Sequence, residues 1–135
     1  MKNTLFTLCF SSFIGHELDA VSQAEWRLLY GLRDLPDAVA EPLFVALHVP
    51  LFALLIALAW AEHTKLRERT RLLLAGFSVF HAGLHHALRH HPLYTFDSPL
   101  SQALIFGCGL LGLAYLLAHW LGRRHTLNSI TGSHQ

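Results

Sequence analysis

The chain has 135 residues, of which 53% are hydrophobic and only 14% are charged, and its formal net charge is +1. Soluble domains carry about 25% charged residues, so the composition favours a membrane protein. The near-neutral charge balance gives no reason to expect a nucleic-acid partner. Cys9 and Cys108 form neither a CxxC pair nor a disulfide framework. The compositional anomaly is the set of eleven histidines.

Four apolar segments follow one another along the chain, at about residues 4–21, 42–61, 72–91 and 100–121. Each has about the 20 residues that a helix needs to cross a bilayer core. They predict an all-α integral membrane four-helix bundle in residues 1–121, followed by a polar tail in residues 122–135. A soluble helical bundle is the alternative, but stretches such as Leu51–Trp60 and Leu104–Leu117 show no polar face.

The first segment also has features of a signal peptide, because Lys2 precedes a short apolar run. A cleavage site requires small residues after that run. His16, Glu17 and Asp19 stand there instead, so we expect the segment to be retained as a span.

The basic residues predict an orientation. If there are four spans, seven lysines and arginines fall on the side of the two termini and three on the other. The positive-inside rule then places both termini in the cytoplasm. The charged stretch 61–71 reads as a solvated loop. Helix starts are expected at Glu41-Pro42 and at Asp97-Ser98-Pro99, since proline is favoured in the first turn.

Several aromatic residues fall on the outer side of the predicted bundle, where aromatic side chains favour the interface of the bilayer. They are Trp26, Tyr30, Tyr94 and Phe96. The stretch GCGLLG at residues 107–112 matches GxGxxG, but it follows no strand and lies inside a span. We expect close helix packing at Ala103 and Gly107 rather than a dinucleotide site.

Polar side chains from three spans reach a similar level. A helix rises about 1.5 Å per residue, so counting residues from the cytoplasmic end of each span gives the depth of a side chain. These side chains lie roughly 14–22 Å deep, in the outer half of the membrane. They are His16, Asp19, His48, His81 and His85. Ionisable groups at such depth usually face a bundle interior or a cavity.

This set predicts a transition-metal site. Imidazole suits zinc, iron, copper and nickel, and a carboxylate is a common companion ligand. His81 and His85 have the i,i+4 spacing of a chelating pair, and Asp19 follows His16 by three residues on the same face. His86 is a further candidate ligand. Zinc or iron is the expected metal, with copper as an additional candidate.

The motifs HELDA (16–20), EWR (25–27), HVPLF (48–52) and HAGLH (81–85) together resemble a small, largely uncharacterised family of bacterial four-span membrane proteins. The resemblance covers roughly residues 5 to 118. It implies a four-span protein of the bacterial cytoplasmic (inner) membrane and emphasises the same five polar residues. It implies no established activity.

Two classes of function remain open. As an enzyme, the site would use the metal on a lipid-like or other small substrate, with Asp19 or Glu17 as proton acceptor. As a non-enzyme, it would handle metal or hold a b-type haem between paired histidines such as His48 with His81 or His85. A structural subunit with a hydrogen-bonded histidine core is the third possibility. A bundle this small is also a candidate for self-assembly.

Overall fold

The computed structural model describes residues 1–131, with side chains as far as residue 124. The described residues form helices and no strand, as predicted. The elements are α1 (Lys2–Ser22), η1 (Glu25–Arg27), α2 (Asp37–Ala59), α3 (Thr64–Leu88) and α4 (Pro99–Thr131). The predicted segments match the four long helices in order. The helix α4 runs ten residues past the predicted end of the fourth span at residue 121, and residues 132–135 lie outside the described part.

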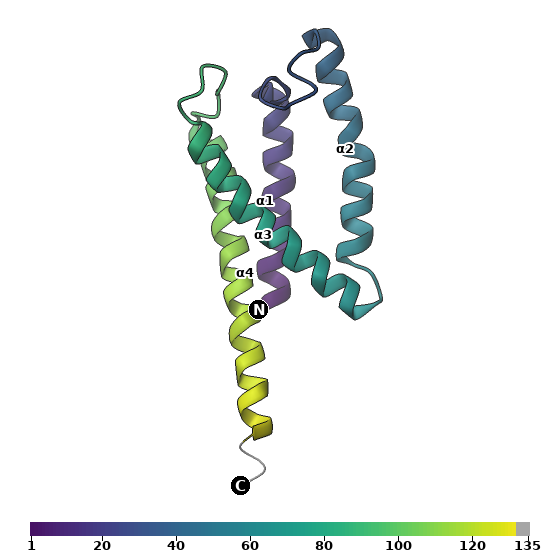
Figure 1. Ribbon diagram of the computed structural model, residues 1–135, viewed down its shortest axis with the longest axis vertical. Coiled ribbons are helices and arrows are strands. Elements are labelled where there is room, and N and C mark those ends of the chain that lie inside the picture. Colours follow the sequence, from purple (N-terminus) through teal and green to yellow (C-terminus); the bar gives the residue numbers. More distant parts are fainter. Residues whose placement is uncertain (132–135) are drawn as a thin grey trace.

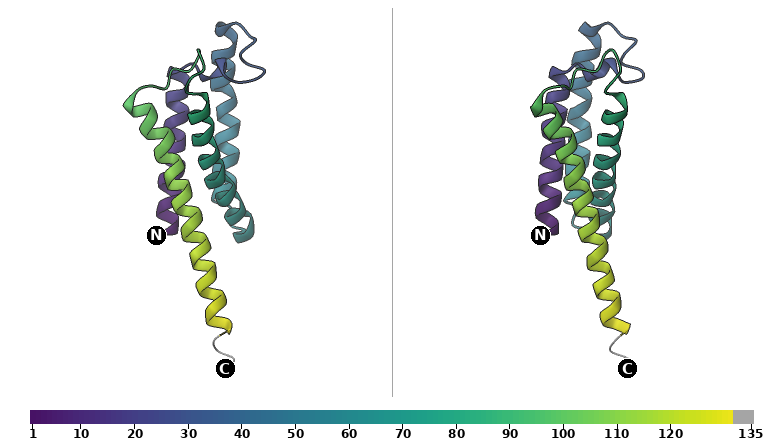
Figure 2. Two further views of the ribbon diagram at one scale, coloured as in Figure 1. Left: turned by 60° about the vertical axis from the view of Figure 1, so that its left-hand side comes forward. Right: turned by 90° about the vertical axis from the view of Figure 1, so that its left-hand side faces the viewer.

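The helix α4 is the central packing element, because it lies along both α1 and α3 (Figure 1). The helix α2 makes far fewer contacts with α1 and α3. The N-terminus, the C-terminal end of α4 and the turn between α2 and α3 lie at one end of the bundle, while the loops after α1 and α3 lie at the other (Figure 2).

The start of α3 differs from the prediction. The charged stretch was read as a loop to residue 71, but the helix begins at Thr64. The His63 side chain caps it by accepting a hydrogen bond from the backbone N–H of Leu66 at 3.3 Å. Lysine, arginine and glutamate are good helix formers, so a run of such residues needs only a cap to become helical.

The two predicted proline starts have different outcomes. The Ser98 hydroxyl accepts a hydrogen bond from the backbone N–H of Ser101 at 3.0 Å, and α4 begins at Pro99, so this cap is confirmed. The helix α2 instead begins at Asp37, five residues before Pro42, which therefore lies inside the helix.

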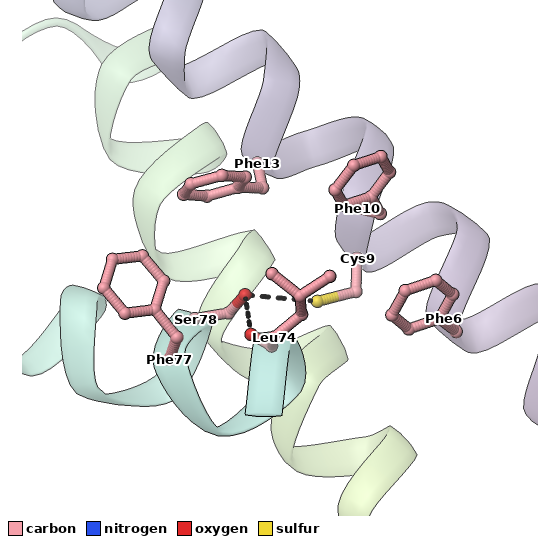
Figure 3. Close-up of a pocket in the computed structure, with 7 residues that line it drawn as sticks. All are labelled: Phe6, Cys9, Phe10, Phe13, Leu74, Phe77 and Ser78. Atoms are coloured by element: carbon pink, nitrogen blue, oxygen red, sulfur yellow. Dashed lines mark hydrogen bonds between the residues drawn. The ribbon is translucent and has the colours of Figure 1, made fainter. Parts of the chain in front are cut away.

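Aromatic rings fill the interior near the termini. Figure 3 shows phenylalanines of α1 and α3 around the Cys9 thiol, which approaches the Ser78 hydroxyl at 3.5 Å. The Cys108 thiol donates to the backbone oxygen of Cys9 at 3.4 Å. Both cysteines are free and buried. The side chains pack so tightly that this region offers no room for a ligand.

The helices α3 and α4 approach closely at two glycines. A Cβ at Gly109 would lie 2.7 Å from the Cβ of Ala82, and one at Gly112 would lie 2.7 Å from the backbone oxygen of Ala75. A Cβ at Gly107 would meet nothing within 4 Å. The close packing predicted at Ala103 and Gly107 was therefore wrong: Ala103 is exposed, and the glycines that meet α3 are Gly109 and Gly112.

Two of the described helices are long and apolar enough to cross a membrane, namely α2 and residues 99–124 of α4. The helices α1 and α3 have 21 and 25 residues, which also suffices in length. They carry more polar residues, among them every residue of the predicted site except His48, which lies on α2.

Candidate metal centre

Three histidines and one glutamate converge near the end of the bundle opposite the termini. His16 comes from α1, Glu25 from η1, and His81 and His85 from successive turns of α3. Each offers one ligand atom, and the four atoms lie within 4.8 Å of one another. His16, Glu25 and His85 are buried, and His81 is half-buried. The cluster could therefore hold a metal ion.

The spacing of the ligand atoms suits a metal ion. The Nε2 atom of His81 lies 2.8 Å from Nε2 of His16 and 3.1 Å from Nε2 of His85. The carboxylate oxygens of Glu25 lie 3.8 Å from His16 Nε2 and 3.7 Å from His85 Nε2. A tetrahedral ion with bonds of about 2.0–2.1 Å separates its ligands by about 3.3–3.4 Å. The two separations between histidine nitrogens are shorter than that value, and the two from Glu25 to the histidines are longer.

Hydrogen bonds alone satisfy this cluster incompletely. One ring nitrogen carries either a proton or a lone pair, so Nε2 of His81 cannot donate to one histidine and accept from the other. Within the described part of the chain, the buried atoms His16 Nδ1 and Glu25 Oε2 also have no hydrogen-bond partner. Buried polar atoms without partners are uncommon and need an explanation.

The loop between α3 and α4 covers the cluster. The Tyr94 hydroxyl lies 3.3 Å from Nδ1 of His85, so it can orient this ring through the nitrogen that faces away from the other ligands. The Phe96 ring is fully buried against the rings of His16 and His85. Trp26, like Tyr94 and Phe96, was expected at the bilayer interface, but all three lie in the core.

The segment after α1 aims Glu25 at the cluster. Ala24 adopts the left-handed conformation with φ 53°, which ends α1 and turns the chain into η1. The side chain of Asp37 accepts hydrogen bonds from Trp26 Nε1 and Arg27 Nε, both at 3.1 Å. This carboxylate therefore ties η1 to the start of α2 and fixes the turn that carries Glu25.

The surroundings of Glu25 favour its charged form. Burial acts to raise the pKa of this carboxyl, but the imidazoles of His85, His16 and His81 beside it outweigh that effect and lower the pKa below its ordinary value. A negative carboxylate facing three imidazoles is the charge arrangement that a cation requires.

His48 and Glu17 form a separate pair beside the cluster. His48 Nε2 lies 2.8 Å from an oxygen of Glu17, and His48 Nδ1 lies 2.7 Å from the backbone oxygen of Phe44. Both ring nitrogens are thus engaged away from the other histidines. The structure brings His16, His81 and His85 together as the sequence suggested, and it places His48 outside that group.

The remaining predicted site residues lie apart from the four ligand atoms. The Gln23 side chain donates to Asp19 Oδ1 at 3.4 Å, while Oδ2 is buried without a partner among the described residues. His86 is exposed and hydrogen-bonds with Arg89. Asp19 is therefore placed as a neighbour of the cluster on α1, and His86 as a surface residue.

Reasoning from the sequence missed Glu25 as a candidate ligand. The residue lies beyond the first predicted span, so a comparison of depths along the helices does not select it. The available signal was the motif EWR, in which all three side chains have structural roles. Glu25 belongs to the cluster, and Trp26 and Arg27 donate hydrogen bonds to Asp37.

A cavity of about 710 Å³ adjoins the cluster between α2 and α3. Its wall is mainly leucine and phenylalanine, and the cluster residues Glu25 and His81 reach it together with the Glu17–His48 pair. The site is thus buried on the side of α4 and open toward this cavity.

Comparison with known proteins identifies a family whose function is unknown. The model of a family of unknown function (DUF6713) matches residues 2–122. No curated protein and no solved structure matches the chain.

Proposed function

Because this chain belongs to the DUF6713 family of unknown function, we propose a function from the site itself: the protein is an integral membrane metalloprotein. It holds one zinc or iron ion, with copper as a further candidate, in its outer half. The ligands are His16, Glu25, His81 and His85. The convergence of four ligand atoms within 4.8 Å carries this proposal.

The membrane setting is part of the proposal. Four spans are supported by the lengths of the four helices and by the apolar surfaces of α2 and α4. The N-terminus, the C-terminal end of α4 and the start of α3 lie at one end (Figure 1), and seven of the ten lysines and arginines belong to these segments. We place that end in the cytoplasm of a bacterium and the chain in its inner membrane.

The metal would determine the chemistry. A bound ion supplies Lewis acidity or redox chemistry. Four protein ligands close a tetrahedral zinc site, whereas iron sites with histidine and carboxylate ligands keep open positions. Zinc would thus favour a structural role and iron an enzyme. In the enzyme, Glu17 is the better-placed proton acceptor, because its side chain lines the cavity, whereas Asp19 does not.

A histidine core without metal is the second candidate, and the short distances of 2.8 and 3.1 Å from His81 to its two neighbours favour it. Haem is a poorer fit, because axial ligands stand on opposite faces of the macrocycle. The expected pairs were His48 with His81 or His85, but both ring nitrogens of His48 are engaged by Glu17 and the backbone of Phe44, and Nε2 of His81 and His85 face each other at 3.1 Å.

Elemental analysis of the protein, purified in detergent without a histidine tag, tests the proposal. We expect near-stoichiometric zinc or iron in the wild type and in His48→Ala, and loss of metal in His85→Ala with the fold retained. The His48 variant is the matched control, since this residue belongs to a helix of the same cavity but not to the cluster. Repeated preparations without metal, or equal metal content in both variants, would contradict the proposal.

A further inference from the structure

Two buried polar atoms on α1 have no partner among the described residues, and they are complementary. They are Nδ1 of His16 and Oδ2 of Asp19. Residues three apart on a helix are neighbours on one face, with Cβ atoms about 5–6 Å apart. Helical side chains lean toward the N-terminus of their helix, so the carboxylate of Asp19 extends back toward the turn that carries His16.

The proposed metal determines which of these two atoms is the donor. Nε2 of His16 lies 2.8 Å from Nε2 of His81 and 3.8 Å from a carboxylate oxygen of Glu25, so this nitrogen faces the other ligands. A neutral imidazole carries one proton, and a metal on Nε2 leaves that proton on Nδ1. The Nδ1–H group of His16 then requires an acceptor, and a carboxylate oxygen is a common one for a ligand histidine.

The other hydrogen bonds of the region leave Oδ2 of Asp19 available for this role. The side-chain amide of Gln23 donates to Oδ1 of Asp19 at 3.4 Å, one helical turn farther along α1. A second histidine of the cluster has the corresponding arrangement, because Nε2 of His85 faces His81 and its Nδ1 lies 3.3 Å from the Tyr94 hydroxyl. A partner on the outward-facing nitrogen therefore already occurs once in this site.

The charge of Asp19 also completes the balance of the site. Three neutral imidazoles and Glu25 supply one negative charge, whereas zinc, ferrous iron and cupric copper each carry two positive charges. The Glu17–His48 pair adds no net charge. Nδ1 of His48 donates to the backbone oxygen of Phe44 at 2.7 Å, so the 2.8 Å contact from Nε2 to Glu17 requires a proton of its own. The second negative charge that a divalent ion requires is therefore that of Asp19.

We propose that Asp19 is a positioning residue of the metal centre. Its Oδ2 accepts the Nδ1–H hydrogen bond of His16, directly or through one water molecule, and its charge makes the site selective for a divalent ion. This inference rests on the proposed metal site. Asp19 acts through His16 and does not bind the ion, since it is not one of the four residues whose ligand atoms converge.

Cobalt in the full-length protein tests this role, because the paramagnetic ion separates the ring N–H protons of its histidine ligands from other NMR signals. Asp19→Ala should lower cobalt affinity about 10–100-fold and remove one N–H signal, that of His16, through faster exchange with water. Tyr94→Phe is the matched control. It should affect the N–H signal of His85 and leave that of His16 unchanged.

Asp19→Asn separates the charge from the hydrogen bond, because the amide keeps an acceptor oxygen in nearly the same shape. This variant should retain the His16 N–H signal and lose about tenfold in cobalt affinity. Coulomb energy is proportional to the charge of the ion, so the same variant should lose only about threefold in affinity for silver(I).

The outcomes separate this inference from the proposed function. If Asp19→Ala binds cobalt within threefold of the wild type, or keeps every N–H signal, the positioning role fails and the metal site stands. Equal losses for cobalt and silver(I) in Asp19→Asn would refute the charge selectivity, and this comparison remains decisive if Asp19→Ala does not fold. If the wild type binds no cobalt, the metal site itself fails.

Discussion

Replacing Glu25 with glutamine tests the ligand that the sequence did not suggest. The change keeps the size of a side chain that is only 7% exposed but removes its charge. Metal binding is worth about 10–16 kcal/mol in four-ligand zinc sites, so the share of one ligand is about 2.5–4 kcal/mol. This share corresponds to an affinity loss of about 10²–10³-fold.

Competition with a chelator of known affinity measures this loss. Thermal or denaturant unfolding provides a second measurement. At a metal concentration of 100 times the wild-type Kd, binding stabilises the wild type by about 2.7 kcal/mol, and a variant with a 100-fold higher Kd by only about 0.4 kcal/mol. The matched control is Glu41→Gln, which changes an exposed carboxylate at the start of α2 and should leave the affinity unchanged. A Glu25→Gln variant within threefold of the wild-type Kd would refute the assignment.

Four further outcomes are expected. Gly112→Ala should destabilise the chain by about 1–3 kcal/mol, because its Cβ would lie 2.7 Å from the backbone oxygen of Ala75, whereas Gly107→Ala should be neutral or stabilise by up to about 1 kcal/mol; thermal unfolding compares the two. Asp37→Ala should lower metal affinity about tenfold in the chelator assay by releasing η1, and Asp34→Ala, an exposed neighbour, should not. Lowering the pH to about 3 should release metal from the wild type, because imidazole binds metal only when neutral and burial opposes its protonation at milder pH; dialysis and elemental analysis follow the release. Reporters fused to either terminus should report the cytoplasm.

Each of these four predictions would be contradicted by a specific result. Equal stability of the two glycine variants would contradict the close approach of α3 and α4. Unchanged affinity after loss of Asp37 would separate η1 from the site. Metal that stays bound at about pH 3 would contradict imidazole and carboxylate ligands, since both are protonated there. A terminus found in the periplasm would reverse the proposed orientation.

The helices and part of the cluster could be predicted because both follow from the positions of residues along the helix axes. Hydrophobic segments of sufficient length define four helices, and counting residues along them gives a depth. His81 and His85 share a face by their i,i+4 spacing, and His16 reaches the same level from α1. The structure brings these three side chains together.

The other features of the site depend on how each helix is rotated about its own axis and on the conformation of the loops. Counting residues along the helices gives neither. His48 is at the predicted level, but its rotation on α2 directs it to Glu17. Glu25 joins the cluster only because Ala24 turns the chain and Asp37 holds the turn. Similarly, Gly107 and Gly109 belong to one motif, and only the rotation of α4 decides which of them meets α3.

X-ray absorption spectroscopy of the metal-loaded protein at neutral pH tests the central claim most directly, since it reports the atoms bound to the ion. The proposed site predicts a first shell of about three imidazole nitrogens and a carboxylate oxygen at about 2.0–2.2 Å. In His85→Ala, the metal should be lost, and with it the absorption edge. A shell with sulfur ligands, or one with oxygen alone, would contradict the assignment of His16, Glu25, His81 and His85 as a metal centre.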